Sequence, residues 1–240
     1  MLRLLILLCA CATAFGALPK GWKACSKSDP KFSDCLSKEI EKAIKSLVKG
    51  DKSLGVMPLD PLRINKIGLS KGRGPVSMEL SLEDADVHGI SMLQVKDTKT
   101  DWKTMNVKVT VPKIVVLSNY KVDGKVLILP ITGQGKGNLT LDDLSLNIES
   151  KWNRIKKGNT EYFNMESLTV PLEPKRLYIR LENLFNGDKV LGENMNKFLN
   201  QNWGVLLDEL REPVSEALSA VFIQIANQVL NKIPASEIDK

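Results

Sequence analysis

Histidine is almost absent from this chain, which has a single one, His88, among its 240 residues. Serine and cysteine nucleophiles usually depend on a histidine base, and zinc sites draw on histidine and cysteine ligands. Cysteine is also scarce, with four in the whole chain. We therefore expect no catalytic residue, no metal site and no cofactor.

Long apolar runs are also scarce. The run near the N-terminus, Leu4 to Ala17, follows Arg3 and spans 14 residues, whereas a membrane-spanning helix needs about 20. A basic residue, a short apolar segment and small residues after it are typical of a secretory signal peptide. We predict cleavage after Gly16, so that residues 1–16 are the signal peptide and residues 17–240 form a single domain of a secreted, extracellular protein. The alternative is an N-terminal membrane anchor.

Removal of that segment leaves two cysteines, Cys25 and Cys35. In an oxidising compartment this pair is expected to form a disulfide, which could pin an N-terminal helix as a gate or simply restrain the terminus. Loss of Arg3 lowers the net charge from +6 to +5. The lysines are dispersed, with no cluster larger than Lys156-Lys157. The charge thus indicates a solvated surface, and we expect no nucleic-acid partner and no stable insertion into a membrane.

The apolar residues change their spacing twice along the chain. Between Asp29-Pro30 and Gly50 they recur at helical spacing, which predicts a short N-terminal helix. From about Leu62 to Asn183 apolar and polar residues alternate in runs separated by glycine-containing turns, which is typical of antiparallel strands with one buried face. No helical pattern interrupts these runs, so a parallel sheet with crossover helices is not expected.

The last 50 residues return to helical spacing. Asp188 or Asn194 is a suitable N-cap, and Pro213 falls inside the pattern, where proline is expected to kink the helix or divide it. A helix of roughly 35 residues would extend about 50 Å, which exceeds the diameter of a compact domain of this length. The expected fold class is α+β: an elongated structure in which a strongly curved antiparallel sheet wraps a long C-terminal helix.

Three short motifs suggest chemistry, but their context does not support it. Gly68–Gly72 matches the G-x-S-x-G nucleophile pattern around Ser70, yet a glycine-rich turn follows it instead of a helix. Gly133–Gly137 lacks the spacing of a phosphate-binding loop, and glycines in a strand more often mark a bulge or a sharp bend. The acidic stretch Glu83–Asp86 lacks the EF-hand spacing and is interpreted as a solvated loop. Asn138 begins the sequon Asn-Leu-Thr and is a predicted N-glycosylation site.

Four ordered motifs give the mature chain a resemblance to the insect takeout and haemolymph juvenile-hormone-binding family. They are Cys25 and Cys35 with Asp29-Pro30 between them; Pro58-Leu59-Asp60-Pro61-Leu62; Gly124-Lys125-Val126-Leu127-Ile128-Leu129-Pro130 with Gly133, Gly135 and Gly137; and Leu184-Phe185-Asn186-Gly187-Asp188-Lys189 with Leu191-Gly192, Met195-Asn196 and Phe198-Leu199-Asn200-Gln201-Asn202-Trp203. The high-affinity hormone carriers of this family have a second disulfide, for which this chain has no cysteines, so it looks closer to the takeout branch.

The resemblance implies a tubular lipid-binding fold and an internal apolar tunnel. The implied function is a secreted, non-enzymatic carrier, in haemolymph or another extracellular fluid, for juvenile hormone, another terpenoid or a fatty-acid-like lipid. Takeout-like proteins are associated with feeding, circadian rhythm and chemosensory tissue. Tyr120 is the expected polar contact at the tunnel mouth. The expected apolar ligand-binding residues are Val107, Val109, Val126, Ile128, Phe198, Leu199, Trp203 and Phe222.

Three other functions remain open at the level of sequence. The first is a secreted signalling protein that acts through a receptor or other protein partner, with lipid as structural filler. The second is a hydrolase that uses Ser70. The third is a lipid-transfer protein that works at a membrane surface, which the +5 charge would permit.

Overall fold

Two long strands form the centre of the fold. In the computed structural model, which describes residues 18–72 and 74–240, β4 (Thr104–Val126) and β5 (Leu129–Lys157) make a hairpin. They pair in antiparallel fashion along the whole of β4. Alternate residues of β4, from Met105 to Val111, are buried, as the period-two pattern predicts. The predicted signal peptide lies outside the described residues.

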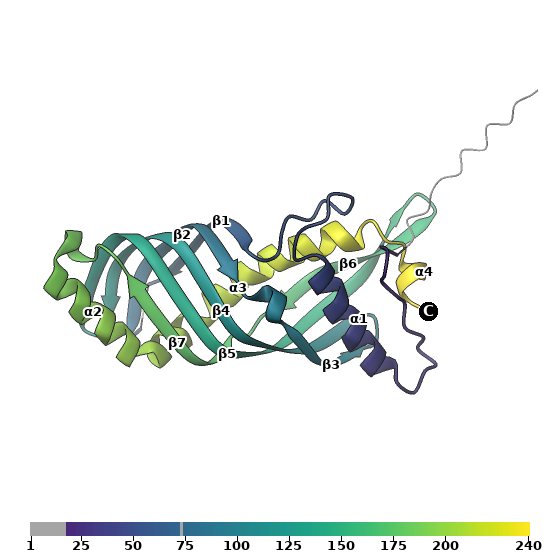
Figure 1. Ribbon diagram of the computed structural model, residues 1–240, viewed down its shortest axis with the longest axis horizontal. Coiled ribbons are helices and arrows are strands. Elements are labelled where there is room, and N and C mark those ends of the chain that lie inside the picture. Colours follow the sequence, from purple (N-terminus) through teal and green to yellow (C-terminus); the bar gives the residue numbers. More distant parts are fainter. Residues whose placement is uncertain (1–17, 73) are drawn as a thin grey trace, which may run out of the picture.

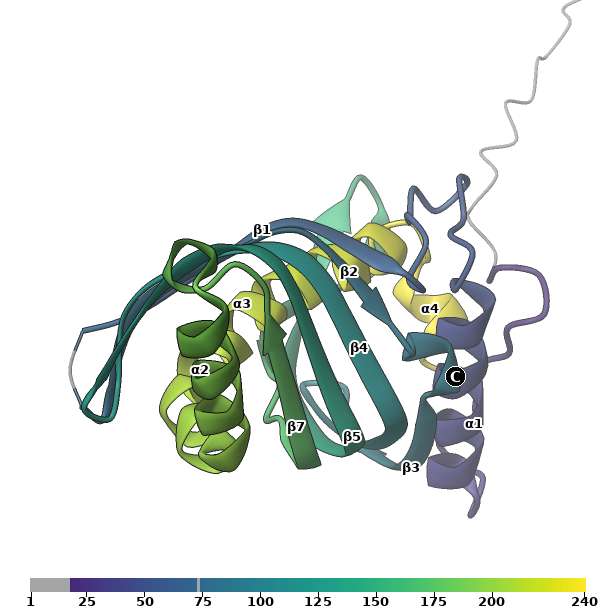
Figure 2. The same ribbon diagram turned by 60° about the vertical axis from the view of Figure 1, so that its left-hand side comes forward.

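The other strands extend this hairpin into one antiparallel sheet of seven strands, in the order β1-β2-β4-β5-β6, with β3 on β4 and β7 on β5. Their bounds are β1, Leu62–Lys71; β2, Val76–His88; β3, Gln94–Thr100; β6, Thr160–Thr169; and β7, Glu173–Leu181. Figure 1 shows the strands crossing the long axis of the molecule obliquely, and Figure 2 shows the sheet arching over helix α3. The predicted antiparallel, strongly curved sheet is confirmed.

The C-terminal helix α3 (Trp203–Leu230) lies in the hollow of the sheet. Its 28 residues correspond to a length of about 42 Å. The sheet is open, and α3 packs against β1 and β6, the first and last strands of the main strand order. The helix therefore bridges the two edges, so that sheet and helix together enclose an interior.

Of the two outcomes expected at Pro213, a division of the helix or a kink, the division does not occur, because α3 continues through this residue. The break lies at Asn202, between α2 (Lys189–Gln201) and α3, where the backbone leaves helical geometry with φ −110° and ψ 20°. The Asn202 side-chain amide donates to the carbonyl of Phe198 at 2.8 Å and so satisfies one end of α2. Pro213 lies within α3. Asp188 is the N-cap of α2, as predicted, and accepts from the Leu191 N–H at 2.9 Å.

Two further helices lie at the end of the molecule opposite α2 (Figure 1). Helix α1 (Phe32–Ser46) packs against β3, and α4 (Ala235–Ile238) packs against β6. The N-terminal arm before α1 is attached to that helix by a disulfide between Cys25 and Cys35, whose Cα atoms are 5.9 Å apart. No helix in the described ranges combines the length and apolarity needed to cross a membrane.

The turn before β1 is attached to the end of β2 through Asp60. Its carboxylate accepts from the N–H groups of Gly89 and Ser91 and from the Ser91 hydroxyl, at 2.5–3.2 Å. Burial alone would raise the pKa of Asp60, but the hydrogen bonds from Ser91 and Gly89 outweigh it and lower the pKa below 3.8. The charged carboxylate therefore stabilises this junction.

Glycines in β5 allow another segment to cross close to the strand. A Cβ atom at Gly133 would lie 2.9 Å from both the Leu184 Cα and the Tyr120 hydroxyl, and one at Gly135 would lie 2.6 Å from the Glu182 carbonyl. The register between β4 and β5 is continuous through these positions, so the expected bulge is absent there. Close approach, rather than a bulge, explains the alternating glycines.

Candidate functional site

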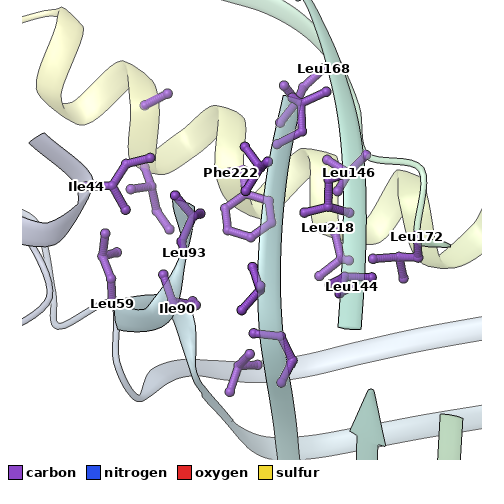
Figure 3. A pocket seen from close by; sticks show the side chains of 18 of the residues that line it. Ile44, Leu59, Ile90, Leu93, Leu144, Leu146, Leu168, Leu172, Leu218 and Phe222 are labelled. Carbon is purple, nitrogen blue, oxygen red and sulfur yellow. The ribbon is translucent and has the colours of Figure 1, made fainter. Parts of the chain in front are cut away.

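An apolar cavity of about 650 Å³ lies inside the tube formed by the sheet, α1 and α3. This volume is within the range of about 300–1,000 Å³ that is usual for small-molecule sites. Figure 3 shows Phe222 and Leu218 of α3 facing the same space as Leu144 and Leu146 of β5. Among the described residues, Lys23 and Glu39 are the charged ones in its lining. The interior is thus suited to an apolar molecule.

Helix α3 provides one wall of the cavity. Val214, Leu218, Phe222 and Ile225 follow one another at spacings of three and four, which places them on one face of the helix. These side chains are half-buried although they face the interior. The part of each side chain that no other residue covers faces the cavity, because a side chain in a close-packed core would be covered on all sides.

Helix α1 and the arm before it cover another side. Leu36, Ile40 and Ile44 line the cavity at intervals of four residues. On its other face α1 is held to β3 by polar contacts: Glu41 accepts from the Val95 N–H at 2.8 Å, and the Ser37 hydroxyl is hydrogen-bonded to the hydroxyl of Thr98 at 3.0 Å. These contacts and the disulfide fix a helix whose apolar face closes the interior.

Some of the few polar side chains in the lining have a hydrogen-bond partner among the described residues, and others have none. The indole N–H of Trp22 donates to Ser46 at 3.0 Å, and that of Trp152 donates to Ser150 at 2.6 Å. The Nε1 atom of Trp102 and the Oγ atom of Ser118 are buried and have no hydrogen-bond partner within residues 18–72 and 74–240. Both residues line the cavity.

Four of the nine residues expected to bind ligand line this cavity: Val107, Val109, Leu199 and Phe222. They come from β4, α2 and α3, which the fold brings around one space. Direct binding of a ligand by these four stays a prediction.

The other five lie outside the lining. Ile128 is 90% exposed in the turn between β4 and β5, and Val126 is fully buried. Phe198 and Trp203 lie on α2 and at the start of α3, where they are half-buried. Their apolar character indicates burial, but it does not indicate which buried surface faces the cavity.

Tyr120 is buried instead of standing at a mouth. Its hydroxyl donates to the carbonyl of Glu182 at 2.6 Å, beside the glycines of β5. Burial raises its pKa to about 12, and the negative charge of Glu182 adds to the effect. Tyr120 is therefore a neutral structural donor that holds the crossing segment.

Some lining residues were missed by the sequence reasoning. Trp102, Leu218 and Ile225 belong to this group, as do Ile40 and Ile44 of α1. The spacing of the helical residues places them on apolar faces, which is a usable signal. Trp102 lies in the turn between β3 and β4, where no periodicity applies.

Ser70, the central residue of the suspected nucleophile motif, lies far from His88, the single histidine of the chain. Ser70 lies in β1 and pairs with Glu79, near one end of the β1-β2 ladder, whereas His88 is the last residue of β2, at the other end. The separation along the ladder is roughly 30 Å at 3.3 Å per residue. Ser70 is also exposed and lies within strand β1.

The acidic stretch of β2 is a β-bulge, not the loop that we expected. The register shifts between Glu83 and Asp86. Glu83 pairs with Lys66 at 3.3 Å, and Asp86 pairs with Arg63 at 3.2 Å. In the part of the chain that the structure describes, no group of three or more histidine, cysteine or acidic residues is arranged to hold a metal ion.

Asn138, the residue of the glycosylation sequon, is exposed in the middle of β5. Its strand partners are Leu117 of β4 and Arg180 of β7. Solvent can therefore reach its side chain, and modification at this site stays a prediction.

Comparisons with known proteins agree over nearly the whole chain. The circadian clock-controlled protein daywake of Drosophila melanogaster is 27% identical over 230 residues, which cover 91% of this chain and 87% of that protein. The daywake protein of Drosophila yakuba is 26% identical over 232 residues, with 92% and 88% covered. The crystal structure of Epiphyas postvittana Takeout 1 superposes with a TM-score of 0.80 and 26% identity, and covers 91% of this chain and 99% of that one.

The family description "Haemolymph juvenile hormone binding protein (JHBP)" matches residues 4–239. The match includes all seven strands and helices α1 to α4, and thus every element that lines the cavity. The chain belongs to the haemolymph juvenile hormone binding protein family, as its sequence motifs predict.

Proposed function

We propose that this protein is a secreted carrier that holds one small hydrophobic molecule inside the tube. The observation that supports it most is the apolar cavity of about 650 Å³. Transfer of apolar surface from water to such an interior is favourable by about 25 cal/mol per Å². A carrier needs no reactive group, and Ser70 and His88 lie too far apart to act together.

The proposed ligands are terpenoids, juvenile hormone among them, and fatty-acid-like lipids. The lining offers almost no charged partner, so recognition rests on shape and on apolar contact along the chain of the ligand. A long, narrow molecule fits because the lining extends from Leu18 and Ile44 at one end to Leu199 and Leu206 near the other.

Secretion is part of the proposal. The disulfide between Cys25 and Cys35 is typical of oxidising compartments. We expect the protein to appear in the culture medium when it is expressed in insect cells, with residue 17 as its N-terminus. Retention of the full chain in the cell membrane would contradict this part.

A competition assay tests the carrier function. The protein is titrated with a fluorescent apolar probe such as N-phenyl-1-naphthylamine, and candidate lipids are then added to displace it. We expect saturable uptake of one probe molecule per chain and displacement by at least one terpenoid or long-chain lipid. Absence of probe uptake and of lipid binding would contradict the proposal and would favour a protein that signals through a partner.

The names of the two Drosophila relatives describe them as clock-controlled. We propose that production of this carrier also follows the daily cycle. Transcript levels sampled over 24 hours should oscillate, and constant levels would contradict this.

A further inference from the structure

Three of the four most exposed large apolar side chains in the described residues lie at the α2 end of the molecule. Ile128 is 90% exposed in the turn between β4 and β5, and Val190 and Leu191 are 70% and 51% exposed in the first turn of α2. We call these three residues the apolar tip. Apolar residues scattered singly over a surface are ordinary, whereas a group of them at one place marks a site of interaction.

The two parts of the apolar tip lie at the same end because they adjoin one buried cluster. Leu127, which precedes Ile128, packs against a cluster that includes Met195 and Leu199 of α2. Figure 1 shows α2 at one end of the long axis of the molecule. The cavity extends to this end, since Ile131 and Leu199 line it. Ile131 follows Ile128 closely along the chain, at a distance of roughly 10 Å or less at 3.3 Å per residue.

The turn that carries Ile128 is not built from residues that favour turns. Val126 pairs with Leu129, so Leu127 and Ile128 are its two central residues. Leu127 has φ +55°, a left-handed conformation for which such turns normally use glycine or asparagine. The Leu127 N–H donates to the Pro75 carbonyl at 2.6 Å, and this bond holds the turn against the segment before β2. Turn formation therefore does not explain why an isoleucine is presented to solvent here.

The size of the apolar tip argues against a protein partner. A specific protein–protein interface covers about 800 Å² and 20–30 residues on each side, and three exposed side chains supply only a small part of that area. A lipid bilayer needs no complementary surface, because apolar side chains enter the boundary between its head groups and acyl chains wherever they project. A bilayer is also the phase in which an apolar ligand of the cavity dissolves.

We propose that the apolar tip docks the protein on the surface of a lipid bilayer. Ile128, Val190 and Leu191 enter the boundary between head groups and acyl chains, and the contact is shallow and reversible because so few side chains form it. The consequence of docking rests on the proposed carrier function. It brings the end of the cavity that Ile131 and Leu199 line against the membrane, so that a ligand passes between the two with little exposure to water.

The charges near the apolar tip indicate that apolar contact drives the docking. The exposed charges closest to it along β4 and α2 come in pairs of opposite sign: Asp123 with Lys125, Asp188 with Lys189, and Glu193 with Lys197. They give this end no local excess of positive charge, so attraction to anionic lipids is not required. A neutral phosphatidylcholine bilayer is therefore the appropriate probe.

The test is co-flotation of the full mature chain with phosphatidylcholine vesicles. The variants are Ile128→Ser and the double replacement Val190→Ser/Leu191→Ser. Met57→Ser is the matched control, since Met57 is 62% exposed but lies in the segment between α1 and β1. Each variant of the apolar tip should weaken vesicle binding about tenfold or more, because its apolar surface no longer leaves water. Met57→Ser should bind within about twofold of the wild type.

Ligand binding in solution separates docking from the carrier function. None of the replaced residues lines the cavity, so probe uptake by all variants should equal that of the wild type. A wild type that takes up the probe but does not bind vesicles, or vesicle binding that the replacements leave unchanged, would refute the docking alone. A dimer that Ile128→Ser abolishes in analytical ultracentrifugation would assign this end to a second copy of the chain. A wild type that takes up neither probe nor lipid would refute the carrier function itself.

Transfer kinetics give an independent readout. A fluorescent fatty acid is loaded into the protein, and its arrival in phosphatidylcholine vesicles that contain a quencher is followed by stopped flow. If the protein docks, the transfer rate should rise with vesicle concentration in the wild type and in Met57→Ser, and the rise should be lost in Ile128→Ser. A wild-type rate that is independent of vesicle concentration would contradict the proposal, because it would show that the ligand first leaves into water.

Discussion

Replacement of Ala217 by phenylalanine distinguishes a ligand cavity from an ordinary core. Ala217 lies on α3 and lines the cavity, so a phenyl ring there would project into the enclosed space. The ring would bury roughly 100 Å² of additional apolar surface, a gain of about 2.5 kcal/mol. Ordering the side chain costs about 0.5–1 kcal/mol. The expected net effect on the free energy of unfolding is therefore an increase of about 1.5–2 kcal/mol.

If the interior were close-packed, the same substitution would lower the free energy of unfolding. Insertion of a large side chain into such a core destabilises by about 1–3 kcal/mol. The same ring should also lower the affinity for a long-chain lipid about tenfold or more, because it removes apolar contact area from the ligand. Ala220→Phe is the matched control, since Ala220 is an exposed residue on the same helix and is not part of the lining.

The assays are urea unfolding and displacement of the fluorescent probe. We predict that Ala217→Phe gains stability and loses ligand affinity, while Ala220→Phe leaves the affinity unchanged. A loss of stability of more than about 1 kcal/mol together with unchanged affinity would refute it, because this result would show that the space is already filled.

Three further predictions concern helix α1 as a lid over the cavity, the hydrogen bonds of Asp60 between the turn before β1 and the end of β2, and the close approach of Glu182 to β5. Replacement of Cys25 and Cys35 by serine should accelerate lipid release several-fold, because α1 loses its tether to the arm; an unchanged off-rate in stopped-flow displacement would contradict a lid. The pKa of Asp60 is lowered on folding, so its stabilising effect is present above its ordinary value of 3.8 and is lost as the pH falls through the lowered folded value. The difference in unfolding free energy between Asp60→Asn and the wild type, measured with urea, should therefore be clear at pH 6 and shrink as the pH falls below 3.8, and a constant difference would be the contrary result. Gly135→Ala should destabilise by about 1–3 kcal/mol, because its Cβ would lie 2.6 Å from the Glu182 carbonyl; a thermal melt identical to that of the wild type would argue against the close crossing.

Much of the fold could be predicted from the sequence because its signals are local. The alternation in β4 from Met105 to Val111 requires a strand with one buried face, and the length of the C-terminal apolar stripe requires an elongated body. The position of the helix break could not be predicted. Pro213 has the strongest local signal, but Asn202 is where the direction of the chain changes, and that choice depends on how α2 packs against β7.

The site was less predictable for a physical reason. An apolar side chain that faces a cavity and one that faces the core have the same composition and spacing, so Val109 and Val126 look alike in sequence although only Val109 lines the cavity. The sequence also does not show whether the polar group of a buried tyrosine or tryptophan finds a hydrogen-bond partner. Tyr120 is satisfied by a carbonyl that approaches across glycines, whereas the Trp102 N–H is not satisfied. Both outcomes depend on distant segments of the chain.

The most direct test of the carrier function is native mass spectrometry of the protein secreted from insect cells, followed by organic extraction and identification of what is released. The account predicts a single apolar molecule bound in one-to-one ratio, lost on extraction and restored when a long-chain lipid is added back. A protein that is recovered at the mass of the bare chain, and that takes up neither terpenoids nor long-chain lipids, would contradict it.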